Sequence, residues 1–246
     1  MHKLELNQDY IRFEEFLLNI SDYFFTNDNS IHKARNELKV ILHDNLYTIV
    51  KSFKIPHLLN RIIYSFFRDS KAKKSYDYSL RLKDFAPMPI GYIEYFKYGL
   101  IYNSYFVSEE FKYDFTIREP LLDDSFEHRE EVFRAFARFT LALHDNQIFH
   151  KDYSPGNILI KKEKDDYIFK IVDVNRMGFF ELSQKDRAKN FSKLWAHDYI
   201  LEIMADEYIK HHICDITFKE DVLYYSNLNK KIKNFKKRLK GQEVND

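Results

Sequence analysis

The feature that most constrains this chain is the polar stretch from His150 to Asn157, together with the two apolar runs that follow it. The stretch reads His-Lys-Asp-Tyr-Ser-Pro-Gly-Asn and leads directly into the run 158–160, while the second run, 169–172, ends at Asp173. Short runs rich in β-branched and aromatic residues predict two strands of a hairpin. The sequence therefore predicts an Asp, an Asn and a second Asp at one edge of a small sheet.

These oxygen-bearing side chains suit phosphoryl transfer. Asp152 would orient the attacking hydroxyl, while Asn157 and Asp173 would hold the magnesium ion that bridges the phosphates. The spacing His-x-Asp-x-x-x-x-Asn, followed by a strand that ends in Asp, is the catalytic-loop signature of protein kinases. The alternative is a hairpin whose Asp, Pro, Gly and Asn are ordinary turn formers, and it leaves His150 unexplained.

Composition fits a globular, intracellular chain. The 246 residues are 45% hydrophobic and 17% aromatic, enough for one large domain or two lobes. The single cysteine, Cys214, excludes an internal disulfide and a cysteine-based zinc cage. The first residues lack the apolar core of a signal peptide, and no run approaches the ~20 apolar residues of a membrane span. We therefore expect a cytoplasmic protein that at most lies peripherally on the cytoplasmic face of a membrane.

The net charge of +1 hides a strong segregation of charge. Residues 51–83 hold nine Lys or Arg against two Asp, residues 109–131 hold nine acids against three bases, and residues 230–240 hold seven bases and no acid. This asymmetry predicts a basic face and a separate acidic stretch.

Strand and helix patterns divide the chain into three parts. Residues 1–28 place Phe and Tyr at helical spacing, which predicts one amphipathic helix that forms an N-terminal extension. Strands are expected at residues 31–37, 38–42, 47–53, 90–95 and 100–107, and later helices at 126–144, 187–194, 199–212 and 228–240. These patterns predict an α+β, bilobal, protein-kinase-like fold with an antiparallel-sheet N-lobe (29–111) and a mainly helical C-lobe (112–246).

In such a fold a lysine on the third strand neutralises the phosphates of the nucleotide. Lys51, preceded by Thr-Ile-Val, occupies the place of that lysine, and Lys54 is the neighbouring alternative. A glycine-rich phosphate loop is missing, because the first glycine is Gly91. Lys33 and Arg35 would then replace glycine flexibility with positive charge in binding the phosphates.

Two helical segments follow. Residues 56–69 interleave large apolar side chains with Arg, which predicts either a helix docked on its own lobe or an interfacial helix in a lipid headgroup layer. Residues 70–85 are the candidate for the helix whose acid pairs with the strand lysine. Asp77 is the best-placed acid, with Asp69 and Glu94 as substitutes; the simpler account of Asp77 is a surface acid on a basic helix.

Residues 108–111 lie where a kinase chain passes the adenine, so Glu109 and Phe111 are expected at the nucleotide. The basic end at 228–240 has two interpretations, a solvated helix or a contact with anionic lipid, and we favour the solvated helix.

The run 143–159 resembles that of the lipopolysaccharide core kinases, the Kdo and heptose kinases of Gram-negative bacteria, and the segments 48–54 and 70–76 are also similar to them. The resemblance covers roughly residues 30–200. It implies ATP-dependent phosphorylation of a sugar hydroxyl on a lipid-anchored core oligosaccharide at the cytoplasmic face of the inner membrane.

Carried over residue by residue, the resemblance makes Asp152 the catalytic base, Asn157 and Asp173 the Mg2+ ligands and Lys51 the phosphate lysine, with His150 supporting the loop. Two departures stand out. Asp-Val-Asn at 173–175 replaces Asp-Phe-Gly, and Ser154 replaces the lysine of many protein-serine kinases, for which Arg176 or a nearby basic side chain would supply the charge.

Two other functions stay open from the residues. One is a kinase that acts on a protein or a soluble small molecule, which a comparison of acceptors would separate. The other is a nucleotide-binding pseudokinase, which the absence of a glycine-rich phosphate loop favours. The intact set of Lys51, Asp152, Asn157 and Asp173 speaks against a pseudokinase, because a scaffold has no need of all four.

Overall fold

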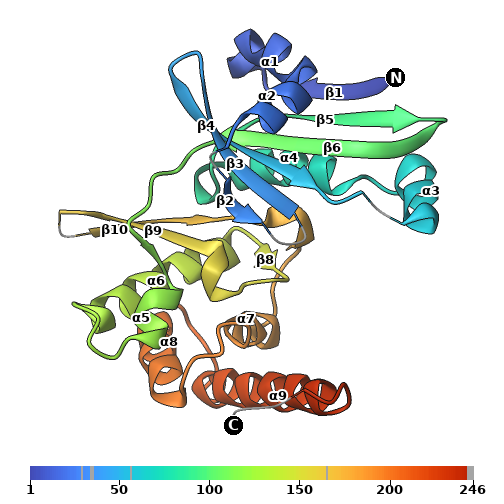
Figure 1. The fold of residues 1–246 in the computed structure, drawn as a ribbon. Helices are drawn as coiled ribbons and strands as arrows, with labels where there is room; N and C mark the ends of the chain where they lie inside the picture. Colours follow the sequence, from blue (N-terminus) through green and yellow to red (C-terminus); the bar gives the residue numbers. More distant parts are fainter. Residues whose placement is uncertain (29, 34–35, 56, 165, 243–246) are drawn as a thin grey trace. The chain divides into compact units, whose positions relative to one another are not determined.

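The structure, a computed structural model, describes residues 1–28, 30–33, 36–55, 57–164 and 166–242, with only the backbone described for residues 31–33 (Figure 1). The chain forms two compact units. The first comprises residues 1–112 with 173–175, and the second comprises residues 113–172 and the chain from 176 onward.

The first unit is built on a six-stranded antiparallel sheet (Figure 1). In spatial order its strands are β1 (His2–Leu6), β5 (Pro89–Lys97), β6 (Leu100–Glu109), β4 (Leu46–Phe53), β3 (Asn36–His43) and β2 (Ser30–Lys33). The strands expected at 38–42, 47–53, 90–95 and 100–107 are therefore present, and β1 is an additional one. Of the strand expected at 31–37, β2 covers the first part, residues 34–35 lie outside the described residues, and the last two residues belong to β3.

Two tight turns set the register of this sheet. Asp44 and Asn45 join β3 to β4 with φ values of 46° and 59°, and Tyr98 and Gly99 join β5 to β6 with φ values of 54° and 75°. Positive φ at both central residues is the geometry of the two-residue hairpin turn that matches the twist of the strands, and Asn and Gly adopt it most easily.

The prediction of a single helix over residues 1–28 is wrong. The first residues instead form β1, which pairs with β5 so that Leu4 lies opposite Ile93. A 3-10 helix (Gln8–Phe13), α1 (Glu14–Leu18) and α2 (Ile20–Thr26) follow. Leu4 and Leu6 alternate with polar residues and pack against the core, which is a strand pattern that the helical spacing further along obscured.

The close packing of β1 and α1 on the sheet explains a glycine in β5. A Cβ atom on Gly91 would lie 2.6 Å from Cδ2 of Leu17 and 2.7 Å from the carbonyl oxygen of Glu5. No side chain fits there, so Gly91 allows the N-terminal segment to cover the sheet.

Helices α3 (Leu58–Phe66) and α4 (Lys71–Leu82) complete the first unit. The hydroxyl of Ser70 caps α4 by accepting a hydrogen bond from the backbone N–H of Lys73 over 3.1 Å. Ala72 and Tyr76 of α4 pack in one apolar cluster with Phe53, Tyr92 and Phe106 of the sheet. The helix is therefore fixed to the strand that carries Lys51.

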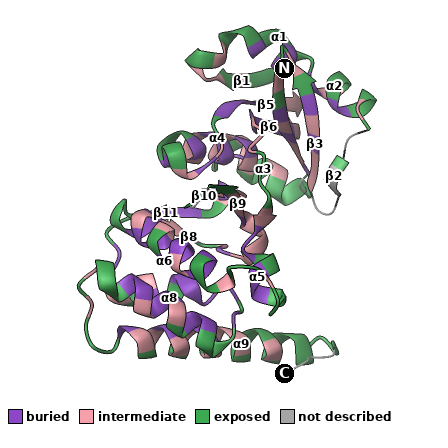
Figure 2. Cartoon of the chain, turned by 90° about the vertical axis from the view of Figure 1, so that its left-hand side faces the viewer, coloured by how far each residue is buried: buried purple, intermediate pink, exposed green. Residues whose placement is uncertain are grey.

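The second unit is mainly helical, with two small sheets. Its elements are β7 (Phe115–Thr116), α5 (Arg118–Leu122), α6 (Arg129–Asp145), β8 (Ile148–His150), β9 (Ile158–Glu163), β10 (Asp166–Ile171), β11 (Met177–Phe179), α7 (Gln184–Phe191), α8 (Asp198–His211) and α9 (Phe218–Arg238). The strands pair in the orders β10-β9-β7 and β11-β8. Buried residues gather along α6 and α8, whereas α9 is mostly intermediate or exposed (Figure 2).

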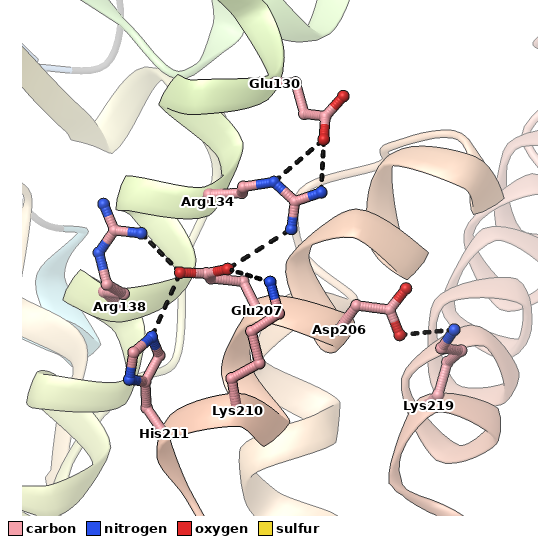
Figure 3. A network of polar contacts seen from close by, with 8 residues as sticks. All are labelled: Glu130, Arg134, Arg138, Asp206, Glu207, Lys210, His211 and Lys219. Atoms are coloured by element: carbon pink, nitrogen blue, oxygen red, sulfur yellow. Dashed lines mark hydrogen bonds and ion pairs between the residues drawn. The ribbon is translucent and has the colours of Figure 1, made fainter.

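A polar network joins α6 to α8 (Figure 3). The buried carboxylate of Glu207 accepts hydrogen bonds from Arg138 (2.6 Å), Lys210 (3.0 Å) and His211 (3.3 Å), and Arg134 reaches it at 3.4 Å. Burial raises the pKa of Glu207, but the hydrogen bonds from Lys210, Arg138 and His211 outweigh it and lower the pKa to about 2. This charged cluster therefore holds two helices of the second unit together.

Candidate active site

Lys51 and Asp173 form the first part of the candidate site. Lys51 lies in β4, between Leu38 of β3 and Phe106 of β6. Its ammonium forms an ion pair with Oδ1 of Asp173, which is 122 residues further along the chain. The Lys51 side chain is only 12% exposed, whereas that of Asp173 is 36% exposed. The lysine of the pair is thus largely enclosed, and its carboxylate partner is partly exposed.

The backbone at Asp173 is in the left-handed region, with a φ of 57°. This region is costly for residues with a Cβ, although Asp tolerates it better than most. The Nδ2 of Asn175 donates to Oδ1 of Asp173 over 2.7 Å, so one carboxylate oxygen accepts from both Asn175 and Lys51. Conformations of this kind concentrate at functional positions, where the surroundings hold them in place.

The loop after β8 forms the second part. The backbone N–H of Asp152 donates to Nδ1 of His150 over 3.1 Å, so the other ring nitrogen, Nε2, carries the proton and donates to the carbonyl of Val172 over 3.1 Å. The Nδ2 of Asn157 donates to the carbonyl of Asp152 over 2.9 Å, and the N–H of Val172 donates to the carbonyl of Asn157. Val172 immediately precedes Asp173. His150 therefore supports the loop through its ring.

The carboxylate of Asp152 is accessible, with 45% of its side chain exposed. Nη1 of Arg176 lies 3.9 Å from Oδ2 of Asp152. An exposed pair at this separation contributes little stability. Its consequence is local, because Arg176 places positive charge beside the carboxylate.

A buried chain of hydrogen bonds anchors this loop to the helices. Nε2 of His144 donates to Oδ1 of Asn190 over 3.0 Å, and Nδ2 of Asn190 donates to the carbonyl of His150 over 2.9 Å. The hydroxyl of Tyr208 donates to Nδ1 of His144 over 2.9 Å. Burial lowers the pKa of His144 to about 4, against a smaller opposing effect of the bond to Asn190, so its ring is neutral at pH 7.

The residue after Asp152 is anchored in the same way. Tyr153 is fully buried, stacks on Phe136 of α6, and its hydroxyl is 2.9 Å from that of Thr140. Sequence reasoning missed Asn190, His144 and Tyr208 as parts of the site. The only available signal was that polar side chains occupied positions expected to be helical, which does not reveal their partners.

The structure does not bring Asp77 to Lys51. Oδ2 of Asp77 accepts from Nζ of Lys73, one turn earlier in α4, over 2.6 Å, and Lys51 pairs with Asp173 instead. The pair within α4 forms because side chains four residues apart lie on one helix face. The substitute Glu94 is buried in β5, where burial raises its pKa and a hydrogen bond from Ser70 opposes the rise.

The other expected nucleotide residues have varied positions. Arg35 and the side chain of Lys33 lie outside the described part of the chain. Glu109 ends β6, and its carboxylate accepts from the hydroxyl of Tyr10 over 2.6 Å. Its N–H donates to the carbonyl of Met88 over 2.9 Å, so an adenine would have to use other backbone groups here. Phe111 follows β6 and is half-buried.

A surface hollow of about 520 Å³ lies elsewhere, between α8 and α9. Its lining includes Ile209, Ile213, Cys214, Ile216 and Phe218 and none of the kinase-motif residues. This hollow is therefore separate from the candidate site.

Comparison with known proteins decides the family. The model of the lipopolysaccharide kinase (Kdo/WaaP) family matches residues 80–208, which is just over half of the chain and includes Asp152, Asn157 and Asp173. The chain belongs to this family. No curated protein sequence matches the chain.

A solved structure described as WaaP in complex with acyl carrier protein has a TM-score of 0.62 and 14% identity to this chain, and the match covers 94% of this chain and 99% of that one. At this identity the likeness concerns the fold, and it confirms the predicted protein-kinase-like fold. Kdo/WaaP family proteins are lipopolysaccharide kinases, so the protein is a phosphotransferase with a hydroxyl acceptor. Among the described residues, no helix is long and apolar enough to cross a bilayer.

Proposed function

We propose that this lipopolysaccharide kinase transfers the γ-phosphoryl group of ATP to a sugar hydroxyl, of Kdo or heptose, in the inner core of lipopolysaccharide. The observation that carries the proposal is the ion pair between Lys51 and Asp173. A lysine in the middle of a sheet and an Asp in a left-handed conformation are paired although they are far apart in sequence, which brings together a cation that can neutralise phosphate and a carboxylate that can hold a metal ion.

Each motif residue has a separate role in this proposal. Lys51 neutralises phosphate charge, and Asp152 accepts a hydrogen bond from the acceptor hydroxyl and orients it for in-line attack. Arg176, beside Asp152, offsets negative charge that develops during transfer. Catalysis then consists mainly of positioning and charge neutralisation.

The donor set fits a magnesium ion. The amide nitrogen of Asn157 donates to Asp152, which leaves the amide oxygen as the atom that can face a cation, and Asp173 supplies a carboxylate. Magnesium prefers such oxygen ligands and completes its shell with water and phosphate oxygens. Within the described residues no three His, Cys, Asp or Glu side chains form a metal cluster, so binding of Mg2+ would depend on the nucleotide.

The test compares the isosteric variant Asp152→Asn with Asp166→Asn, which changes an exposed carboxylate on the β9–β10 hairpin. Transfer of labelled phosphate from ATP to purified lipopolysaccharide should fall by roughly 10²–10⁴-fold in the first variant, the usual contribution of such a group, and stay unchanged in the second. ATP affinity should be similar in both. Substantial turnover by Asp152→Asn would rule out the role of Asp152.

The acceptor is tested separately. Lipopolysaccharide from cells with and without the protein should differ by one phosphate in its mass, and fragmentation would locate it on Kdo or heptose. Faster transfer to a protein or a soluble sugar than to lipopolysaccharide would instead favour the alternative acceptors. Chelation of Mg2+ should stop the transfer.

A second part of the proposal is peripheral contact with the inner membrane through α3. This helix docks by its polar side, because Nε of Arg61 donates to the carbonyl of Ile101 and the N–H of Ile101 donates to the hydroxyl of Ser65, both over 2.8 Å. Its large apolar side chains face solvent, with exposed fractions of 61% for Leu58, 77% for Leu59, 66% for Phe66 and 78% for the following Phe67.

This orientation is the reverse of that expected for a helix that docks on its own lobe by its apolar face, because here the polar face contacts β6. An exposed apolar face within the basic stretch 51–83 matches the surface of an anionic bilayer in both polarity and charge. Co-sedimentation with phosphatidylglycerol vesicles should weaken about tenfold or more in Leu59→Glu/Phe66→Glu. The control Ile11→Glu/Phe25→Glu also changes two exposed apolar residues of the first unit. Equal loss in both variants would refute a specific role of α3.

A further inference from the structure

The C-terminal helix α9 is attached to the loop that precedes α8, residues 192–197. The Nδ2 of Asn229 donates to the carbonyl of Ser192 over 2.8 Å, and Nζ of Lys230 donates to the carbonyl of Ala196 over 2.8 Å. These two contacts come from adjacent residues of the helix and hold the two ends of the loop against it. The residues between Ser192 and Ala196 are therefore fixed in place beside α9.

Trp195 lies at the centre of this loop and is the only tryptophan of the chain. It is 37% exposed, and its backbone is in the left-handed region with a φ of 59°, which is rare for a bulky residue. Nζ of Lys233 lies 5.0 Å from the centre of its ring, and Nζ of Lys237 lies 5.6 Å from it. Trp195, which is exposed and has a strained backbone, therefore lies beneath two ammonium groups of α9.

A third ammonium belongs to the same group. Nζ of Lys193 lies 3.4 Å from Oδ1 of Asn229 in α9. Within the described part of the chain, no carboxylate forms an ion pair with Lys193, Lys233 or Lys237, whereas the neighbouring Lys230 has Asp198 at 3.8 Å. The three lysines therefore concentrate positive charge that the described chain does not neutralise.

Asp152 is within electrostatic reach of this group. Partial burial lowers the pKa of Lys233, and the charges of Lys193 and Lys237 lower it further. The charge of Asp152 opposes the shift and raises the pKa. Hydrogen bonding supports the same neighbourhood, because Nδ2 of Asn190, two residues before Ser192, donates to the carbonyl of His150, two residues before Asp152, over 2.9 Å. The loop that carries Trp195 therefore begins beside the loop whose carboxylate orients the acceptor in the proposed reaction.

We propose that Lys233 and Lys237, which lie over the ring of Trp195, and Lys193, which contacts Asn229 of the same helix, bind an anionic group of the sugar acceptor, a phosphate or a carboxylate. This inference rests on the proposed function, because it places the anion next to the hydroxyl that Asp152 orients. Ammonium groups form strong charge-assisted hydrogen bonds with both kinds of anion, and an aromatic ring offers an apolar surface to the carbon-bound hydrogens of a sugar.

The position beside Asp152 favours a substrate over a membrane or an acidic protein as the partner. A general attraction to anionic surfaces would be served equally well by the other lysines of α9, such as Lys231 and Lys236, which have the same charge and exposure. Those two lysines therefore provide a matched control.

Trp195 supplies the readout, because light absorbed by indole but not by the 18 tyrosines excites this one residue of the chain selectively. Deacylated lipopolysaccharide, which carries phosphate and carboxylate groups, should change the fluorescence saturably, and a neutral oligosaccharide of equal length should not. In Lys233→Met/Lys237→Met the dissociation constant should rise about tenfold or more, as expected when two charge-assisted contacts are lost. Lys231→Met/Lys236→Met should bind like the unchanged protein. Methionine keeps the apolar stem, so packing against Trp195 is retained.

Dephosphorylated probe distinguishes the two anions. Undiminished binding assigns the site to a carboxylate, and lost binding assigns it to a phosphate. Equal affinity in both double variants, or a response to polyglutamate but not to the oligosaccharide, would overturn the proposal. Because the titration needs no turnover, transfer activity without a tryptophan response would remove this site and leave the proposed function standing. A tryptophan response without transfer activity would leave this binding site standing and remove the proposed function.

Discussion

Acidification should destabilise this protein through His144, well above the pH at which its carboxylates protonate. The ring of His144 is fully enclosed and neutral, and it links Tyr208 to Asn190 behind the loop that carries Asp152. In the unfolded chain the same imidazole takes up a proton near its ordinary pKa of 6.5, whereas in the folded protein the pKa is lowered to about 4. Below pH 6.5 the unfolded state therefore binds more protons, and stability falls as the pH falls.

The size of the effect follows from the two pKa values of His144, 6.5 and about 4. At 1.36 kcal/mol for each pH unit, the full loss is about 3 kcal/mol once the pH passes below 4. About 2 kcal/mol of this is already lost at pH 5, and less than about 1 kcal/mol at pH 6. The contribution is thus complete above pH 6.5 and is lost between pH 6.5 and 4.

Urea unfolding at about pH 7, 6 and 5 measures this slope directly. The variant His144→Gln keeps a donor and an acceptor but does not titrate, so its free energy of unfolding should vary less with pH, and the difference from the unchanged protein should shrink by about 2 kcal/mol between pH 7 and 5. His197→Gln, which changes an exposed histidine of the same unit, is the control and should keep the original slope.

The reasoning fails if the unchanged protein and His144→Gln have parallel stability profiles from pH 7 to 5. In that case His144 would be protonated in the folded state, and the tautomer assigned from its contacts with Tyr208 and Asn190 would be incorrect.

Three further outcomes are expected. Asn190→Ala leaves His144 and the carbonyl of His150 without their buried partner, so it should cost about 3 kcal/mol of stability. It should also lower kcat while the KM for ATP stays unchanged; an unchanged kcat would show that Asn190 does not position the loop. Glu207→Gln should cost about 2 kcal/mol, less than its pKa implies because Arg138 is half-exposed. This cost should be constant between pH 7 and 5, because the pKa of Glu207 lies below pH 5 both in the folded protein, where it is about 2, and in the unfolded chain, where it has its ordinary value of 4.5. Lys51→Met should lower transfer roughly 10²-fold or more, measured against Lys54→Met, and equal activity of the two variants would contradict the role of Lys51.

Local patterns predicted the elements of this fold where the signal lies within a few residues. The hairpin of β3 and β4 follows from two alternating runs around Asp44 and Asn45, whose side chains favour positive φ. The catalytic-loop spacing likewise predicted roles for Asp152, Asn157 and Asp173, because each sits at a fixed distance in sequence from a turn or from the end of a strand. The N-terminal strand β1 was not predicted. Its five residues contain only two leucines, so their alternating pattern is weaker than the helical spacing of the residues that follow.

Partnerships between side chains could not be predicted in this way. The sequence offered Asp77 as the partner of Lys51. The structure instead pairs Lys51 with Asp173, and it pairs Asp77 with Lys73, which lies one turn earlier on the same helix face. Nothing in the sequence joins His144 to Asn190. Their contact exists only because α6 and α7 pack around β8.

What the sequence by itself determined is most of the strands and helices and the kinase-like class, because these depend on short-range periodicity and turn geometry. The residues of the phosphoryl-transfer motif follow from the same patterns as a prediction. Only the tertiary structure decided that α3 turns its apolar side to solvent, that α9 gathers lysines around Trp195 and that a buried histidine supports the loop. The physical reason is that burial and charge pairing depend on which surfaces meet, and a local pattern gives the shape of each surface but not its neighbour.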